Sequence, residues 1–244
     1  MTDGLLLIHG WPLDARMWEP QRTALRDRVL VAAPHLPGFG GTVSAGRVMT
    51  MEAAANRCLD ALEAAGVDRA VVCGISMGGY VAFELWRRER RLFVGLVLAN
   101  TRAGADNEEG RAKRVALAER LRSEGSGFLL ENPPPLLSDS ATPDVRGRVM
   151  EIFAEQPADS IAAASLGMAE RPDSTPDLAS IDVPTAVVTS SADALIPPDM
   201  STPLADAIPG AELTVLEGAG HMSGLEDPEG FNSAVERTLE RSFG

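Results

Sequence analysis

The segment from Gly74 to Gly78 constrains the fold of this chain more than any other short stretch of its sequence. It reads Gly-Ile-Ser-Met-Gly and lies between the apolar run 70–73 and the helix-like stretch 80–86. A strand, a sharp turn with a serine at its apex and a helix together form the local context of a nucleophile elbow. Glycines suit such a turn because a Cβ would collide with the neighbouring strand and helix. The pattern therefore predicts a strand-turn-helix unit that presents Ser76.

Among the three histidines of the chain, His9, His35 and His221, only the last is placed to act as a base for this serine. A serine hydroxyl is a weak nucleophile at neutral pH and needs a neighbouring group to take its proton. At an elbow of this kind the acid and the histidine follow the serine along the chain, which leaves His221. It stands in a glycine-rich segment after the apolar run 211–216, and loops beyond strand ends collect catalytic groups in open α/β sheets. The alternative is a histidine that only stabilises its loop.

The acid that would orient His221 is expected after another strand, between Ser76 and that histidine. Segment 184–190 is such a strand, and Asp193 follows it directly. We therefore predict Asp193 as the acid. The alternatives lie before this strand, deeper in its loop or after the preceding strand, and they are Asp182, Asp199, Asn100 and Asp106.

The apolar run 5–8 leads into the sequence His-Gly-Trp-Pro at 9–12. A continuous apolar run is typical of a parallel strand buried on both faces. The tetrahedral intermediate of acyl transfer carries a negative oxygen, which two preorganised backbone N–H groups hold best. One donor is expected from Met77, directly after the serine, and the other from the loop after this early strand. Because proline has no N–H, Trp11 is the predicted second donor, and His9 is expected to fasten the loop rather than to carry protons.

Strand candidates separated by helical patterns indicate a doubly wound, mostly parallel α/β sheet in one domain that spans 1–244. Thr50 is the expected N-cap of a helix that ends at Gly66, and a last helix is expected over 228–242. The six strand candidates are 4–8, 28–33, 70–73, 94–99, 184–190 and 211–216.

Segment 101–182 is too long for a simple crossover between two strands, and it contains helical runs such as 108–122. Long insertions at such a point are typically active-site lids, so we expect a helical cap over the pocket, with a mobile linker as the alternative. Arg171 is a candidate for a substrate carboxylate, although an exposed salt bridge is the simpler expectation. Apolar candidates for the pocket, each of which would also suit the plain core, are Phe128, Leu129, Phe153, Met168, Trp11, Leu13, Leu195 and Met222.

With these motifs in this order, the chain resembles the α/β-hydrolase superfamily nearly from end to end. Within it, the chain is most similar to the enol-lactonase, carboxylesterase and cofactor-free haloperoxidase group. The resemblance implies the α/β-hydrolase fold and a Ser-His-Asp hydrolase that uses no metal and no cofactor, but it names no substrate. The residues that carry it are His9-Gly10-Trp11-Pro12-Leu13, Leu36-Pro37-Gly38-Phe39-Gly40, Gly74-Ile75-Ser76-Met77-Gly78-Gly79, Asp193 and Gly220-His221.

Two features depart from the pattern of this superfamily. Members usually begin with an antiparallel strand pair, whereas here the strand 4–8 starts almost at Met1. The sheet is expected to lack that pair, which leaves 4–8 nearer an exposed edge, and a homodimer that covers this edge is a hypothesis. Relatives often carry an aspartate where this chain has His35, and both a supporting role and a neutral substitution are open.

The charge balance argues against nucleic acid as a partner, because 22 basic and 35 acidic residues leave a net charge of −13. No apolar stretch reaches the length of a membrane span, so no membrane association is expected. Two cysteines, Cys58 and Cys73, suit a reduced compartment better than a disulfide framework. Together with an N-terminus that has no visible secretory signal, these features predict a cytoplasmic protein.

The reaction that these residues favour is hydrolysis of a small to medium carboxylic ester or lactone through an acyl-enzyme. The same three residues would also support perhydrolysis, thioester cleavage or a cofactor-free lyase reaction, because the pocket decides what is admitted. A hydrolase fold kept as a non-catalytic ligand receptor is the third interpretation.

Overall fold

A six-stranded sheet forms the centre of the computed structural model, which describes residues 1–244. The strands stand in the spatial order β2-β1-β3-β4-β5-β6, and every neighbouring pair is parallel. This doubly wound sheet is the predicted one, without an antiparallel pair at its start. The strands are β1 (Asp3–Ile8), β2 (Leu30–Ala32), β3 (Arg69–Ile75), β4 (Phe93–Ala99), β5 (Thr185–Ser190) and β6 (Glu212–Leu216).

The strand order reverses between β1 and β3, and that switch point decides where a site can form. The chain leaves β1 for one side of the sheet to make β2 and then returns to place β3 on the other side. Loops that leave in opposite directions open a crevice at the carboxyl ends of the two strands. The loop at 9–12 follows β1 and Ser76 follows β3, so both lie at this crevice.

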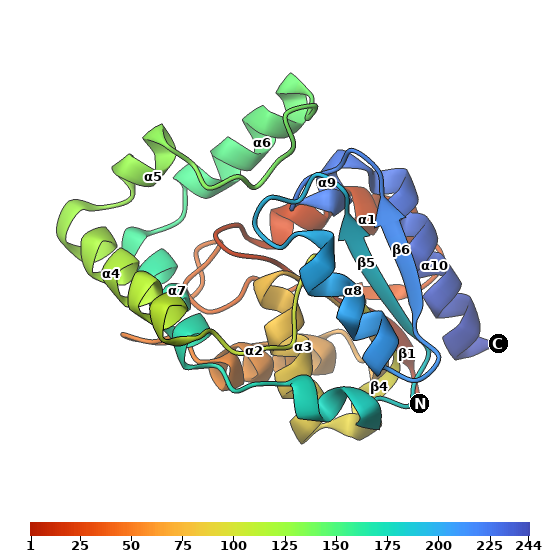
Figure 1. Cartoon of the computed structure of the whole chain (residues 1–244). Helices are drawn as coiled ribbons and strands as arrows, with labels where there is room; N and C mark the ends of the chain where they lie inside the picture. Colours follow the sequence, from red (N-terminus) through yellow and green to blue (C-terminus); the bar gives the residue numbers. More distant parts are fainter.

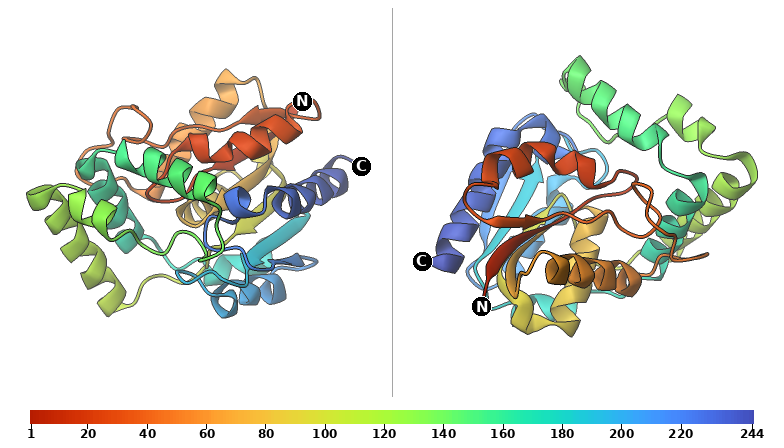
Figure 2. Two further views of the ribbon diagram at one scale, coloured as in Figure 1. Left: turned by 90° about the horizontal axis from the view of Figure 1, so that it is seen from above. Right: turned by 180° about the vertical axis from the view of Figure 1, so that it is seen from behind.

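Helices cover both faces of the sheet (Figures 1 and 2). One face carries α1 (Glu19–Leu25) and α10 (Pro228–Phe243), and the other carries α2 (Met51–Ala64), α3 (Met77–Arg88) and α8 (Pro198–Ala207). The Thr50 side chain accepts a hydrogen bond from the Ala53 N–H at 3.1 Å, as its predicted role as N-cap of α2 requires. Strands β3 and β5 are buried almost throughout, which explains their uninterrupted apolar sequences.

The first four helices of the segment 101–182 lie beyond the carboxyl ends of the strands, whereas its last element, a 3-10 turn, lies at the opposite end of the sheet, before β5 (Figure 1). Asn107 caps the first of them through the Gly110 N–H, and Thr142 caps the third, which starts with Pro143. Helices α4 and α7 pack along each other. The helices are α4 (Glu108–Glu124), α5 (Gly127–Glu131), α6 (Pro143–Ala154), α7 (Ala158–Glu170) and the 3-10 turn η3 (Thr175–Ser180).

Hydrogen bonds tie these helices to the loops at the top of the sheet. The Trp11 indole N–H donates to the carbonyl of Ile161 in α7 at 3.1 Å. Gln156, just after α6, donates to the Asp14 carboxylate at 2.8 Å and accepts from the Gly40 N–H at 3.0 Å. The helical segment is therefore anchored directly to the loop that follows β1.

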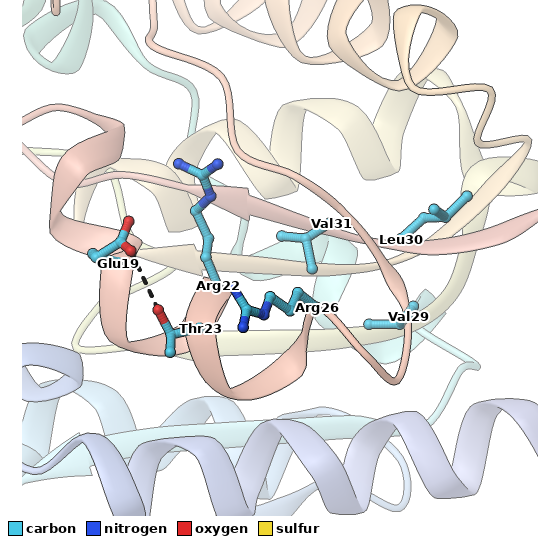
Figure 3. A pocket seen from close by; sticks show the side chains of 7 residues that line it. All are labelled: Glu19, Arg22, Thr23, Arg26, Val29, Leu30 and Val31. Atoms are coloured by element: carbon cyan, nitrogen blue, oxygen red, sulfur yellow. Dashed lines mark hydrogen bonds between the residues drawn. The ribbon is translucent and has the colours of Figure 1, made fainter.

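The edge strand β2 is shorter than predicted, because it pairs only with residues 4–6 of β1. Leu30 is 50% exposed there. A hollow of about 230 Å³ lies between this edge and α1 and contains none of the candidate site residues (Figure 3). The homodimer over this edge stays a prediction.

Two further predictions concern the state of the cysteines and the absence of a membrane span. Cys58 and Cys73 are both buried and unpaired. Burial raises the pKa of the Cys58 thiol to about 12, so this side chain stays a protonated apolar group. No helix combines the length and the apolar character that crossing a membrane requires.

Candidate active site

The turn between β3 and α3 holds Ser76 in a strained conformation, with φ at 54° and ψ at −116°. A positive φ in a non-glycine residue costs about 1–3 kcal/mol and persists only where the surroundings enforce it. The surroundings do so by close packing. A Cβ on Gly74 would lie 2.3 Å from the Gly78 carbonyl oxygen, and a Cβ on Gly78 would lie 2.1 Å from the Ile8 carbonyl oxygen. Both glycines are thus required by contact, as the sequence pattern predicts.

The structure brings Ser76, His221 and Asp193 into one line of hydrogen bonds. The Nε2 atom of His221 lies 2.8 Å from Ser76 Oγ, and its Nδ1 atom lies 2.8 Å from Asp193 Oδ2. The three residues follow β3, β6 and β5, and they meet because parallel strands end at the same edge of the sheet. All three are buried. None of the alternative acids contacts the histidine.

Asp193 is held as an ionised acceptor. Its Oδ1 accepts the backbone N–H groups of Leu195 and Ile196, both at 2.9 Å. Burial acts to raise the pKa of this carboxyl, but the hydrogen bonds from His221, Ile196 and Asn100 outweigh it and lower the pKa. An ionised carboxylate only accepts, so in neutral His221 the proton is on Nδ1. Nε2 is then free to accept the hydroxyl proton of Ser76.

Asn100, at the end of β4, is a supporting residue that the sequence did not assign. Its Nδ2 donates to Asp193 Oδ2 at 2.9 Å and to Ser190 Oγ at 2.8 Å, while its Oδ1 accepts from Ser223 Oγ at 2.6 Å. Its φ of 43° is the only other positive value among the non-glycine residues besides Ser76. The sequence offers this position only as an alternative to Asp193. Its amide instead holds the acid that comes from the next strand.

The two predicted oxyanion donors belong to two segments that meet at Ser76. Met77 is the first residue of α3, so its N–H is among those at the helix start that no carbonyl of the helix accepts. The loop that carries Trp11 passes close to the serine, since a Cβ on Gly10 would lie 3.3 Å from Ser76 Cβ. The Trp11 backbone N–H makes no hydrogen bond within the protein. Both donors are therefore available to an oxygen bound at the serine.

His9 fastens this loop. The ring is completely buried, its Nε2 accepts the Leu36 N–H at 3.0 Å, and its Nδ1 donates to the Gly10 carbonyl at 3.2 Å. Burial lowers the pKa of His9 to about 4, so the ring is neutral at pH 7. Its edge also packs against Phe39.

His35, whose role the sequence left open, lies outside this group of residues. Its Nδ1 accepts the Ala15 N–H at 3.3 Å, at the start of the 3-10 turn η1 (Ala15–Trp18). The ring covers Gly40, where an added Cβ would lie 2.0 Å from Nδ1. It packs two loops together and does not contact Ser76 or its partners.

A cavity of about 210 Å³ opens onto Ser76 and His221. It is smaller than the roughly 300–1,000 Å³ of pockets for drug-sized ligands, which favours a small substrate. Of the predicted pocket residues, Trp11, Met168 and Leu195 line it, whereas Leu13, Phe153 and Met222 are fully buried in the core and Phe128 and Leu129 pack against the core elsewhere. The other lining residues are Tyr80, Arg102, Arg114, Ile196 and Met200.

The expected exposed salt bridge of Arg171 is wrong in one respect, because this side chain is only 2% exposed. It pairs with Asp106 at 2.8 Å and lies over the Tyr80 ring at 4.1 Å. Arg171 does not line the cavity. Arg102 and Arg114 do line it, and no motif in the sequence points to either of them.

Comparison with known proteins agrees with this architecture. The family model described as "Alpha/beta hydrolase family" matches residues 5–234. The chain belongs to the α/β-hydrolase family. Its similarity to members of that family extends over nearly its whole length, and esterases, enol-lactonases and a bromoperoxidase are among the similar proteins.

Three relatives illustrate the similarity. A pimeloyl-[acyl-carrier protein] methyl ester esterase of Neisseria meningitidis is 33% identical, over 96% of this chain and 92% of the relative. A 3-oxoadipate enol-lactonase of Acinetobacter baylyi is 28% identical, over 89% of this chain and 81% of the relative. A thermophilic esterase of Thermogutta terrifontis, solved with malate bound, is 38% identical with a TM-score of 0.94, over 100% of this chain and 92% of the relative. This α/β-hydrolase is thus an enzyme of the esterase class.

Proposed function

We propose that this chain hydrolyses a small carboxylic ester or lactone through an acyl-enzyme intermediate on Ser76. The observation that carries the proposal is the unbroken line of 2.8 Å contacts from Ser76 through His221 to Asp193, which opens onto a small cavity. The esterase and lactonase relatives support the same reaction class.

The mechanism follows from the hydrogen bonds of these three residues. His221 Nε2 takes the hydroxyl proton as Ser76 Oγ attacks the carbonyl carbon, and Asp193 stabilises the resulting imidazolium. The N–H groups of Trp11 and Met77 hold the oxyanion of the tetrahedral intermediate. His221 then protonates the leaving alkoxide, and in the second half of the reaction it activates the water that releases the acid.

Segment 101–182 is part of this proposal as a cap that limits substrate size. Met168 of α7 and Arg114 of α4 reach the cavity wall, and the Trp11 indole ties α7 to the loop that carries an oxyanion donor. The cavity of about 210 Å³ leaves little space beyond the reacting group. The expected substrate is therefore an ester with a short acyl or alcohol group, or a small lactone.

The test is labelling with a fluorophosphonate probe, mapped by mass spectrometry, together with ester hydrolysis. Wild type is expected to be labelled on Ser76, and His221→Ala to lose labelling. Ser76→Ala and His221→Ala should each lose turnover by about 10⁴-fold or more. Ser44→Ala and His35→Gln are the matched controls, since neither side chain contacts the three residues.

Well-folded wild type that reacts with neither the probe nor any ester would overturn the proposal. Parallel assays with thioesters, and with peroxide and bromide, separate ester hydrolysis from the other reactions that the same residues support.

A further inference from the structure

The charge of the residues that line the cavity at Ser76 is opposite in sign to the net charge of the chain. The chain carries a net charge of −13, yet no aspartate or glutamate lines this cavity, whereas two arginines, Arg102 and Arg114, do. Arg102 belongs to the loop after β4 and Arg114 to α4 of the proposed cap. Positive charge is therefore concentrated at the one place where a substrate would enter.

A single carboxylate serves as counter-ion for three guanidinium groups at this place. Asp106, which is 6% exposed, accepts from Arg102, Arg114 and Arg171. No other carboxylate lies within ion-pair distance of these arginines, so the cluster carries two surplus positive charges. Burial acts to raise the pKa of Asp106, but the hydrogen bonds and charges of the arginines outweigh it and hold the pKa at about 2.

The three arginines do not share this carboxylate equally. Arg171 contacts both of its oxygens, at 2.8 and 3.2 Å, and also donates to the carbonyls of Met168 and Gly104. It is almost fully buried, and its hydrogen bonds link the loop after β4 to the C-terminal end of α7.

Arg102 and Arg114 keep unused donors. Arg102 makes one hydrogen bond, through Nη2, so Nε and Nη1 have no protein partner. Arg114 bonds Asp106 through Nε and Met168 Sδ through Nη1, so Nη2 has none. Their side chains are 26% and 25% exposed, so these charges are only partly hydrated. Each of the two guanidinium groups therefore has free N–H donors but no free parallel pair, and an anion with two acceptor oxygens could accept one hydrogen bond from each arginine.

We propose that Arg102 and Arg114 form an anion subsite that holds a carboxylate carried by the substrate, apart from the carbonyl that Ser76 attacks. The inference rests on the proposed esterase function and narrows its substrate class to esters or lactones of small dicarboxylic acids. Holding the distant carboxylate against α4 and the loop after β4 would place the ester carbonyl between Ser76 and the oxyanion donors. The cavity of about 210 Å³ leaves space for a short chain between the two groups.

The experiment compares matched pairs of esters. The monomethyl esters of succinate, glutarate and adipate are each measured against the methyl ester of the unsubstituted acid of the same chain length. The ratio of kcat/KM for the acid ester to that for the neutral ester is expected to fall about 10- to 100-fold in Arg102→Gln and in Arg114→Gln, mostly through KM. Arg111→Gln, an exposed residue on the same helix, should keep the wild-type ratio.

Binding of free glutarate to Ser76→Ala, measured by calorimetry, tests the subsite without turnover. Glutarate should bind, and Arg114→Gln in this background should weaken its binding about tenfold or more. Equal loss on both esters of a pair, or glutarate binding that Arg114→Gln leaves unchanged, would overturn the subsite while leaving the esterase proposal intact. Tighter binding of inorganic phosphate than of glutarate would overturn the choice of a carboxylate. Failure of the fluorophosphonate test would instead remove the esterase proposal itself.

Discussion

Acidification should destabilise the loop after β1 through one group, the buried ring of His9. Both ring nitrogens are used in the neutral form, Nε2 as acceptor for the Leu36 N–H and Nδ1 as donor to the Gly10 carbonyl. Protonation at Nε2 would turn that acceptor into a second donor facing an N–H group. Burial accordingly lowers the pKa of His9 from 6.5 to about 4.

The sign and size of the effect follow from linkage. Above pH 6.5 the ring is neutral in both states, so its contribution to stability is complete; below that pH the unfolded chain takes up a proton that the native ring refuses until about pH 4. The free energy of unfolding should therefore fall by about 2 kcal/mol between about pH 7.5 and pH 5, and by about 3 kcal/mol once both states are protonated.

Urea unfolding of wild type and His9→Gln at these two pH values measures the effect. Glutamine keeps an acceptor for the Leu36 N–H and does not titrate. The variant should be less stable than wild type at the higher pH, because packing against Phe39 is lost. Between the two pH values, however, its free energy of unfolding should fall by about 2 kcal/mol less than that of wild type. The other ionisable groups are common to both proteins, so their contributions cancel to first order in the difference. Equal pH dependence of the two proteins would refute the reasoning.

Three further outcomes are expected. Asn100→Ala should lower kcat more than it raises KM, by about tenfold or more, because Asp193 loses a donor that holds it toward His221; unchanged kcat on a neutral ester would contradict this. Asp106→Asn should lower the free energy of unfolding by about 3–5 kcal/mol, as removing one partner of a buried ion pair does. Asp159→Asn, at an exposed position on α7, is the control and should leave the free energy of unfolding nearly unchanged. Sedimentation velocity at high concentration tests the homodimer over the β2 edge, and a monomer there would count against it.

The strands and the three candidate residues were accessible from the sequence because each depends on local information. A buried parallel strand is a continuous apolar run, and Ser76 stands between such a run and a helix. Chain order, together with the position of each residue after an apolar run, then favours His221 as the base and Asp193 among several acids. The length of β2 was harder to predict from the sequence, because an edge strand ends where its single neighbouring strand stops pairing with it.

The polar groups that surround these residues depend on contacts between distant segments. The cluster around Asp106 forms only because α4 and α7 fold back on the loop after β4, which puts Arg114 and Arg171 on one carboxylate. Sequence spacing carries no information on that contact, so the sequence predicts an exposed salt bridge or a contact with a substrate carboxylate for Arg171, and not a buried ion pair with Asp106. Asn100 is similar, since its role depends on the loop after β5.

Glu226 shows how the proposed cap and the histidine loop depend on each other. Its carboxylate accepts the Gly220 N–H at 2.9 Å, next to His221, and the Ser138 N–H at 3.0 Å, in the segment that joins α5 to α6. The Met222 N–H also donates to the Leu136 carbonyl at 2.9 Å. The loop that positions the candidate base is thus braced by the same segment that carries the cap helices. Displacement of that segment would therefore be expected to shift His221 through the Glu226 carboxylate, although neither Glu226 nor the segment lines the cavity.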